Sequence, residues 1–286
     1  PGIGGSTSVP TQKRVSVWLE ATPALLKHLA IAHVVPVSHN AGTVYLLNLL
    51  SQRRDLLWPK APMAVLLAPW AEPKHSDVLS LQVAQMLPTG AFDYWNKLMQ
   101  FVATKAAPSF GASTGVVTKM VNSLPRTSKD SSTDEDGLYL TAYGFEMGAV
   151  KALDRLAMEY VFLESTTGVN EEAVLCLKKG MPGLWGACED LPVYIRALVE
   201  AEERHKQTHP DEQALNIQVF FAETDTMIGL KGQKYFEDCF EQAHLKDVVS
   251  FESSMEKGTD HDSIWASEMG VFKKMLTGIQ GGLHSV

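Results

Sequence analysis

The chain has 286 residues, a formal net charge of −8 at pH 7 and a hydrophobic content of 45%. This length suits one large α/β domain, or a core domain that carries an insertion. The acidic balance argues against a dedicated nucleic-acid binder, which would usually show a basic stripe. No apolar run approaches the roughly 20 residues of a transmembrane helix, so we expect no membrane span.

Cysteine usage gives no sign of a disulfide framework or a zinc site. Cys176, Cys188 and Cys239 cannot all pair with one another, and none stands in a C-x-x-C arrangement. The glycine-rich stretch at residues 2–5 lacks the Lys-Ser/Thr that follows in a phosphate-binding loop. We therefore expect no metal, no cofactor and a reducing, cytoplasmic location, while the sequence does not predict the oligomeric state.

The first 70 residues predict helix, strand, helix and strand in turn. Apolar residues at helical spacing predict a helix from Val9 to Ala30, with a break or a second helix start at Pro23. Ile31–Val37 and Met63–Ala68 are short apolar runs, and Gly42–Arg53 between them has a helical pattern. This spacing is typical of a βαβ unit with buried parallel strands.

From Trp70 to Asn216 the pattern is helical, with no convincing strand. Four patches predict helices: Val78–Met86, Phe92–Ala103, Val150–Leu163 and Leu191–Ala201. Within this region Ser123–Gly137 is polar and rich in turn formers, which predicts an exposed, mobile loop.

After residue 216 the alternation of strands and helices returns. Ile217–Ala222 and Val248–Phe251 predict strands, and Leu230–Ala243 and Ile264–Ile279 predict helices. We expect the four strands to lie parallel in one sheet. The predicted domains are therefore an α/β core, residues 1–69 and 217–286, and a helical insertion, residues 70–216.

The stretch SHNAG, residues 38–42, lies between the first predicted strand and its helix. A nucleophile elbow, G-x-S-x-G, needs small residues two positions before and after the nucleophile, because the turn is crowded and strained. Centring the turn on Asn40 puts Ser38 and Gly42 at those positions, whereas centring it on Ser38 would put Pro36 and Asn40 there. The spacing therefore predicts that Asn40, not Ser38, points into a site.

Two more polar stretches follow predicted strands, which is where ligands bind in open α/β sheets. Asp225 follows one strand, where a carboxylate can orient a histidine or simply cap the next helix. His261 follows another strand and is the last histidine before the expected closing helix; a lone loop histidine is otherwise a surface residue.

An elbow, an acid and a histidine, each after a strand, follow the chain order of the α/β-hydrolase triad. The sequence resembles this superfamily, in particular fungal-type members whose elbow reads HSAGT. Pro1–Ser6 resembles the loop after the fourth strand of that fold, and Ala68–Trp70 and Asp260–Trp265 resemble later landmarks. The resemblance spans almost the whole chain apart from the insertion, and it implies a mostly parallel sheet flanked by helices.

The resemblance also implies roles for individual residues. Asn40 would take the nucleophile's position, Asp225 that of the triad acid and His261 that of the general base. The backbone N–H of Ala41 would stabilise an oxyanion. The insertion resembles a helical cap that shapes an apolar substrate pocket. Two residues are expected to line that pocket, Trp70 and His39.

Two features depart from the family pattern. Asn40 has an amide, from which a histidine cannot draw a proton to make the usual acyl-enzyme. The sequence does not tell whether this Asn is native or introduced. If Pro1–Ser6 follows the fourth strand, then four strands and a second oxyanion N–H lie upstream of Pro1. We therefore expect this sequence to lack N-terminal strands of a longer protein.

Three functions are compatible with these residues. The first is a hydrolase-type enzyme acting on a small apolar ester, lactone or related carbonyl compound. The second is a non-hydrolytic protein of the same fold that binds a ligand or steers a lyase or cyclisation step. The third is a degenerate partner-binding protein. Asp225 and His261 favour the first two, because a scaffold needs neither, whereas Asn40 favours the second and third.

Overall fold

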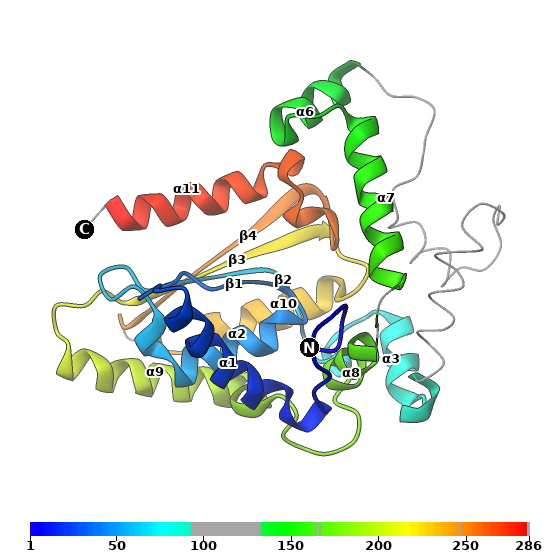
Figure 1. The fold of residues 1–286 in the computed structure, drawn as a ribbon. Helices are drawn as coiled ribbons and strands as arrows, with labels where there is room; N and C mark the ends of the chain where they lie inside the picture. Colours follow the sequence, from blue (N-terminus) through cyan, green and yellow to red (C-terminus); the bar gives the residue numbers. More distant parts are fainter. Residues whose placement is uncertain (93–132, 164, 166, 246, 285–286) are drawn as a thin grey trace. The chain divides into compact units, whose positions relative to one another are not determined.

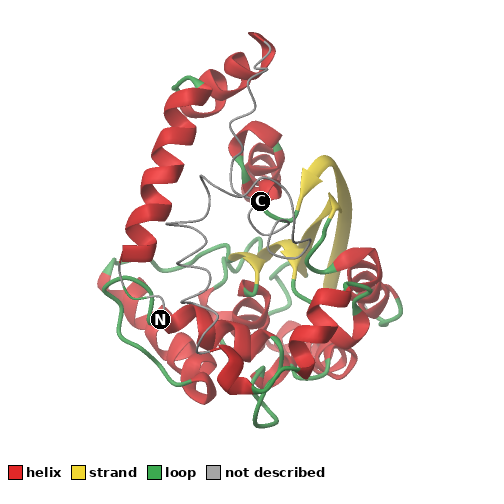
Figure 2. Ribbon diagram, turned by 90° about the vertical axis from the view of Figure 1, so that its right-hand side faces the viewer, coloured by secondary structure: helices red, strands yellow, loops and turns green. Residues whose placement is uncertain are grey.

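Four parallel strands form one sheet in the order β1-β2-β3-β4, which confirms the predicted topology (Figure 1, Figure 2). The strands are β1 (Val37–Asn40), β2 (Met63–Pro69), β3 (Leu215–Thr224) and β4 (Val249–Asp260). The structure is a computed structural model that describes residues 1–92, 133–163, 165, 167–245 and 247–284.

The strands differ in length from the predicted ones at both edges of the described sheet. The first strand was expected at Ile31–Val37, but the ladder begins only at Val37, with one isolated bridge upstream between Val34 and Leu57. Pro36 accounts for this difference, because proline has no N–H to donate to a ladder. β4 continues nine residues past Phe251, to Asp260. Its later residues are mostly polar and only partly buried, so this part of the strand has no apolar pattern from which it could be predicted.

The helices of the α/β part lie where the sequence pattern predicts them, although several of their ends differ. They are α1 (Arg14–His28), α2 (Gly42–Gln52), α3 (Leu79–Met86), α9 (Leu191–Thr208), α10 (Gly229–Glu241) and α11 (Val271–His284). α1 contains Pro23 without ending there, so the predicted break is wrong. The expected helix at Ile264–Ile279 begins only at Val271, because Gly270 has a φ of +77° and separates α11 from two short 3₁₀ turns.

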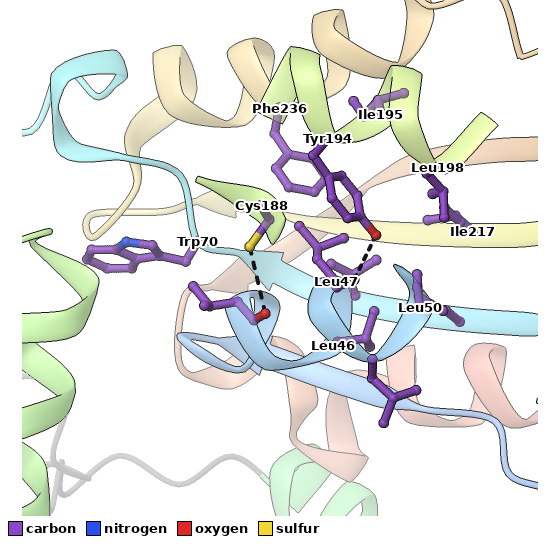
Figure 3. Close-up of a cluster of buried hydrophobic side chains, with 14 of the residues drawn as sticks. Leu46, Leu47, Leu50, Trp70, Cys188, Tyr194, Ile195, Leu198, Ile217 and Phe236 are labelled. Carbon is purple, nitrogen blue, oxygen red and sulfur yellow. Dashed lines mark hydrogen bonds between the residues drawn. The ribbon is translucent and has the colours of Figure 1, made fainter. Parts of the chain in front are cut away.

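Helices cover both faces of the sheet. In Figure 1, α11 lies on one face, and α1, α2, α9 and α10 lie on the other. Each face of the sheet has its own hydrophobic core, and alternate residues of β2 point into one or the other, as expected for a buried strand. Ala64 and Leu66 lie in the larger core, on the side of α2, α9 and α10, and Val65 and Leu67 lie in the smaller core with α11. Figure 3 shows the larger core, where Tyr194 of α9 donates to the carbonyl of Leu47 at 2.8 Å.

The chain divides into two compact units. One consists of Thr11–Gln85 and Leu175–Val286, and the other of Pro1–Pro10 and Met86–Val174. Residues 175–216, which the sequence assigned to the insertion, therefore belong with the sheet. The reason is the apolar face of α9, whose Tyr194, Ile195 and Leu198 are nearly inaccessible and lie in the larger core.

The second unit contains α6 (Thr133–Tyr143), α7 (Met147–Leu163) and most of α8 (Thr167–Cys176). α7 confirms the helix expected at Val150–Leu163. The loop expected at Ser123–Gly137 is helical from Thr133 onward, so that part of the prediction is wrong. Residues 93–132, which include most of the helix expected at Phe92–Ala103, lie outside the described residues.

Candidate active site

Asn40 occupies the corner of a sharp strand-to-helix turn, as the spacing of small residues predicts. Its φ is +52°, in the left-handed region, where asparagine is the side chain other than glycine best tolerated. A Cβ built on Gly42 would lie 3.1 Å from Cβ of Ser38, which shows why both positions need small residues. Ser38 itself is buried behind the turn.

Thr43 links this elbow to the neighbouring strand. Its hydroxyl donates to the carbonyl of Asn40 at 2.7 Å and accepts from the backbone N–H of Trp70 at 2.9 Å. The side chain is almost completely buried. The elbow is therefore held from the first turn of α2 and from the end of β2, which restrains a backbone conformation that costs energy on its own.

Asp225 and His261 form a buried pair beyond the ends of β3 and β4. The Nδ1 atom of His261 lies 3.0 Å from Oδ2 of Asp225. The other carboxylate oxygen accepts from the backbone N–H groups of Met227 at 2.9 Å and Ile228 at 2.8 Å. Because a carboxylate only accepts, Nδ1 of His261 carries a proton, and in the neutral ring Nε2 presents its lone pair. This confirms the predicted hydrogen bond between Asp225 and His261.

The Asp225 carboxyl is held ionised by these contacts. Burial by itself would raise its pKa, but the hydrogen bond and charge of His261, together with the two backbone N–H groups, bring the pKa below its ordinary value. An ionised Asp225 fixes the tautomer of His261 and stabilises the imidazolium form that a general base passes through.

Asn40 belongs to the same group of side chains. Its Nδ2 lies 4.0 Å from the sulfur of Met227, whose backbone N–H binds Asp225. Among the described residues, the buried atoms Oδ1 of Asn40 and Nε2 of His261 have no hydrogen-bond partner. The two side chains therefore do not bond to each other, and the expected approach of Nε2 to within roughly 3–4 Å of Asn40 stays a prediction.

His39 joins the elbow to the loop of His261. Its Nε2 lies 2.7 Å from the backbone carbonyl oxygen of His261, and the two ring centroids are 5.1 Å apart. Burial lowers the pKa of His39; the bond to the carbonyl acts in the opposite direction without reversing that effect. This ring is therefore neutral at pH 7.

The remaining expected site residues lie near the elbow. Ala41 immediately precedes α2, at the helix end whose N–H groups have no partner within the helix. Trp70 follows β2; its indole is nearly inaccessible and donates through Nε1 to the carbonyl of Cys176 at 3.1 Å.

A pocket beside α2 is lined by Trp70, together with Thr43, Cys188 and Tyr235 among others. Asn40, Asp225 and His261 are not among its lining residues. Its carboxylate at Glu72 already pairs with Lys74 and Lys178. The buried polar atoms without partners lie instead at Asn40 and at the Asp225–His261 pair, which form the candidate site.

Three contacts of this site, made by two residues, had no signal in the sequence. Met227 reaches both Asn40 and Asp225, and His39 binds a backbone carbonyl. A main-chain acceptor is the same at every position, so residue types do not reveal it. Thr43 did have a signal, because it is the threonine that follows the elbow glycine.

The described part of the chain holds no group of three or more His, Cys, Asp or Glu side chains arranged to hold a metal ion. No helix within it has the length and apolar character that crossing a membrane requires.

Comparison with known proteins shows the fold. No protein-family model and no curated protein matches the sequence. An esterase from Exiguobacterium antarcticum superposes with a TM-score of 0.53 and 9% identity, over 97% of this chain and 78% of that one. A structure from a study of carboxylesterases of Nitrososphaera gargenis superposes with a TM-score of 0.52 and 10% identity, over 100% of this chain and 79% of that one. The chain has the α/β-hydrolase fold.

Proposed function

We propose that this chain is a hydrolase-type enzyme that acts on a small apolar ester, lactone or related carbonyl compound, with His261 as general base. The observation that carries the proposal is the pattern of hydrogen bonds at the His261 ring. Its Nδ1 is bound to Asp225, while its Nε2 is buried and has no partner among the described residues. A histidine held in this way is equipped to take a proton from an attacking group. The esterases that share the fold support this class of reaction.

Asn40 changes how such an enzyme would work. Its amide replaces the ionisable hydroxyl of a nucleophile, so an acyl-enzyme does not form at this position. Oδ1 of Asn40 and Nε2 of His261 are both acceptors, and an acceptor left unpaired in a buried site costs about 1–3 kcal/mol. A water molecule carries two O–H donors, one for each acceptor. A bare ester has none.

The proposed reaction is therefore direct attack by water. His261 takes one proton from the water as its oxygen bonds to the carbonyl carbon, and Ala41 donates its N–H to the resulting oxyanion. The bond to the leaving oxygen then breaks, and that oxygen takes the proton back from His261. Asp225 stays ionised throughout and stabilises the imidazolium.

Replacement of Asn40 by serine tests the assignment of this site. In the full chain, Asn40→Ser should raise turnover of a short-chain aryl ester and permit labelling by a fluorophosphonate, because a hydroxyl then stands beside the base. Asn40→Ser with His261→Ala should lose both gains. Asn40→Ala, which has neither amide nor hydroxyl, is the matched control and should not label. Labelling of the unchanged protein would contradict the proposal, and Ser38 would then be the first nucleophile to test.

A second candidate is favoured by Asn40 itself. Of the same two acceptors, Oδ1 of Asn40 would bind a hydroxyl of the substrate, and Nε2 of His261 would remove a substrate proton in a lyase or cyclisation step without hydrolysis. Turnover in H₂¹⁸O separates the two functions, because hydrolysis places solvent oxygen in the acid product. If the product carries no ¹⁸O and Asn40→Ser gains no esterase activity, the non-hydrolytic function replaces the first.

The helical insertion would supply apolar surface for binding the substrate. Large apolar side chains of α6 and α7 are exposed, among them Leu138, Leu140, Leu153 and Leu156. We propose that this segment acts as the cap.

A further inference from the structure

Residues 256–264, called the His261 loop below, comprise the last residues of β4 and the turn after it, and three hydrogen bonds tie them to the end of β3. Glu223 accepts from the backbone N–H of Gly258 at 2.8 Å, and the hydroxyl of Thr224 donates to the carbonyl of Thr259 at 3.2 Å. The third tie is the bond between Asp225 and His261. All three come from consecutive residues of one strand end, so by themselves they place His261 relative to β3 and not relative to the elbow.

The elbow lies on a different strand. In the sheet order, β1 and β4 are separated by β2 and β3, and three strand spacings amount to about 14 Å. The base and the elbow can therefore meet only through side chains and loops above the strand ends. His39 makes such a connection, because its Nε2 lies 2.7 Å from the carbonyl of His261, 222 residues further along the chain.

The contacts form a closed ring of residues. Asn40 contacts Met227, Met227 donates to Asp225, Asp225 binds His261, and His261 accepts from His39, which is covalently joined to Asn40. Removing the His39 bond opens this ring at the point where the elbow meets the base.

We propose that His39 is a positioning residue: it holds the main chain of His261 to the elbow, so that Nε2 of His261 and the side chain of Asn40 serve one site. This role rests on the proposed function of His261 as the base. A carbonyl only accepts, so His39 must donate through Nε2–H, and a neutral ring adds no positive charge beside the base. The bond goes to a backbone atom, so any side chain with a donor of the right reach can replace it.

The test compares three variants of the full chain. His39→Leu removes the donor, and His39→Gln restores one through its amide. Thr224→Val is the matched control, because it removes one bond to the same loop from the β3 side. Hydrogen exchange of the peptide covering residues 256–264 is measured first, since it requires no activity. Turnover of the aryl ester is measured second.

His39→Leu should speed exchange of the loop amides about five- to tenfold, the factor that corresponds to one hydrogen bond, and His39→Gln should return most of the protection. His39→Leu should also lower kcat by about tenfold while KM changes less than about twofold, whereas Thr224→Val should leave kcat within about twofold. If the leucine variant does not fold, His39→Phe keeps a ring without a donor.

Two results would overturn the role of His39: exchange and kcat in His39→Leu equal to those of the unchanged protein, or no rescue by glutamine. Failure of the proposed function has a different signature. If His261→Ala leaves turnover intact, His261 is not the base. The difference in hydrogen exchange between His39→Leu and His39→Gln would still show whether the bond from His39 to the carbonyl of His261 holds the loop.

Discussion

Replacing Asp225 by asparagine separates the charge of this residue from its shape. In the structure, Oδ1 of Asp225 takes both backbone bonds, from Met227 and Ile228, and Oδ2 alone faces Nδ1 of His261. The amide oxygen of the introduced asparagine can therefore replace Oδ1 and keep both backbone bonds. Its NH₂ group then faces His261 and donates to Nδ1, which moves the imidazole proton to Nε2. The base loses its lone pair on the side of the elbow.

The magnitudes follow from this change of partner. A wrong tautomer at the histidine of a triad lowers kcat by roughly 10⁴-fold where it has been measured, so we expect about 10³- to 10⁴-fold here. Stability should fall less. All three hydrogen bonds to the carboxylate become bonds to a neutral amide, but the neutral amide also costs less to bury than the carboxylate. The two effects partly cancel, so the free energy of unfolding should drop by about 1–2 kcal/mol at pH 7.

The loss of stability should also depend on pH. The folded-state pKa of Asp225 is lowered, so its carboxylate stabilises the fold fully above the unfolded-state pKa, about 4. That contribution disappears as the pH falls through the folded-state pKa. The stability difference between the unchanged protein and Asp225→Asn should therefore be present at pH 6–7 and shrink below about pH 4.

Two measurements check this reasoning. Urea denaturation at several pH values gives the stability difference, and ¹⁵N chemical shifts of the His261 ring report which nitrogen carries the proton. A variant that keeps the proton on Nδ1, or one whose stability loss is the same at pH 3 and pH 7, would refute the assigned partner arrangement.

The remaining predictions concern the core. Tyr194→Phe removes the hydroxyl that donates to the carbonyl of Leu47 at 2.8 Å (Figure 3). Because that carbonyl lies within a helix and keeps its helical hydrogen bond, the free energy of unfolding should fall by only about 1 kcal/mol in urea denaturation. A loss above about 3 kcal/mol would contradict this. Burial raises the pKa of the Cys188 thiol to about 12, so iodoacetamide at pH 8 should alkylate it about a thousandfold more slowly than an ordinary thiol, as followed by mass spectrometry. Modification of Cys188 in the folded protein at the ordinary rate would show that this thiol is exposed.

The sheet could be predicted because its strands are buried on both faces. Met63–Ala68 is a continuous apolar run and Ile217–Ala222 is apolar except for Gln218, and both lie inside the strands of the structure. The sequence was less informative at the edge strand β4. Its later residues are mostly polar, and such residues are as common in exposed loops as in exposed strands. The location of α9 was missed for a different reason. Helical periodicity shows that a helix has an apolar face but not which surface that face meets.

The site was predictable where sterics select the residue. Ser38 and Gly42 flank Asn40 because the turn has no room for larger side chains, and that crowding is visible in the sequence. The pairing of Asp225 with His261 could be expected only from the family resemblance, since the two residues are 36 positions apart. The tie from His39 could not be expected at all, because its acceptor is a main-chain atom.

The connection between β2 and β3 governs how this chain must fold. Met63 pairs with Asn216, so roughly 150 residues separate two neighbouring strands of one sheet. Closing such a loop is entropically costly, and contacts of this separation slow the search for the native state. During synthesis, β1 and β2 emerge before β3, and β2 has no β3 to pair with until the roughly 150 residues between Met63 and Asn216 have followed. Their apolar faces are exposed during that interval, at the stage when the nascent chain most needs protection from aggregation. We therefore expect refolding to be slow and sensitive to protein concentration, with the elbow among the last parts to reach its final conformation.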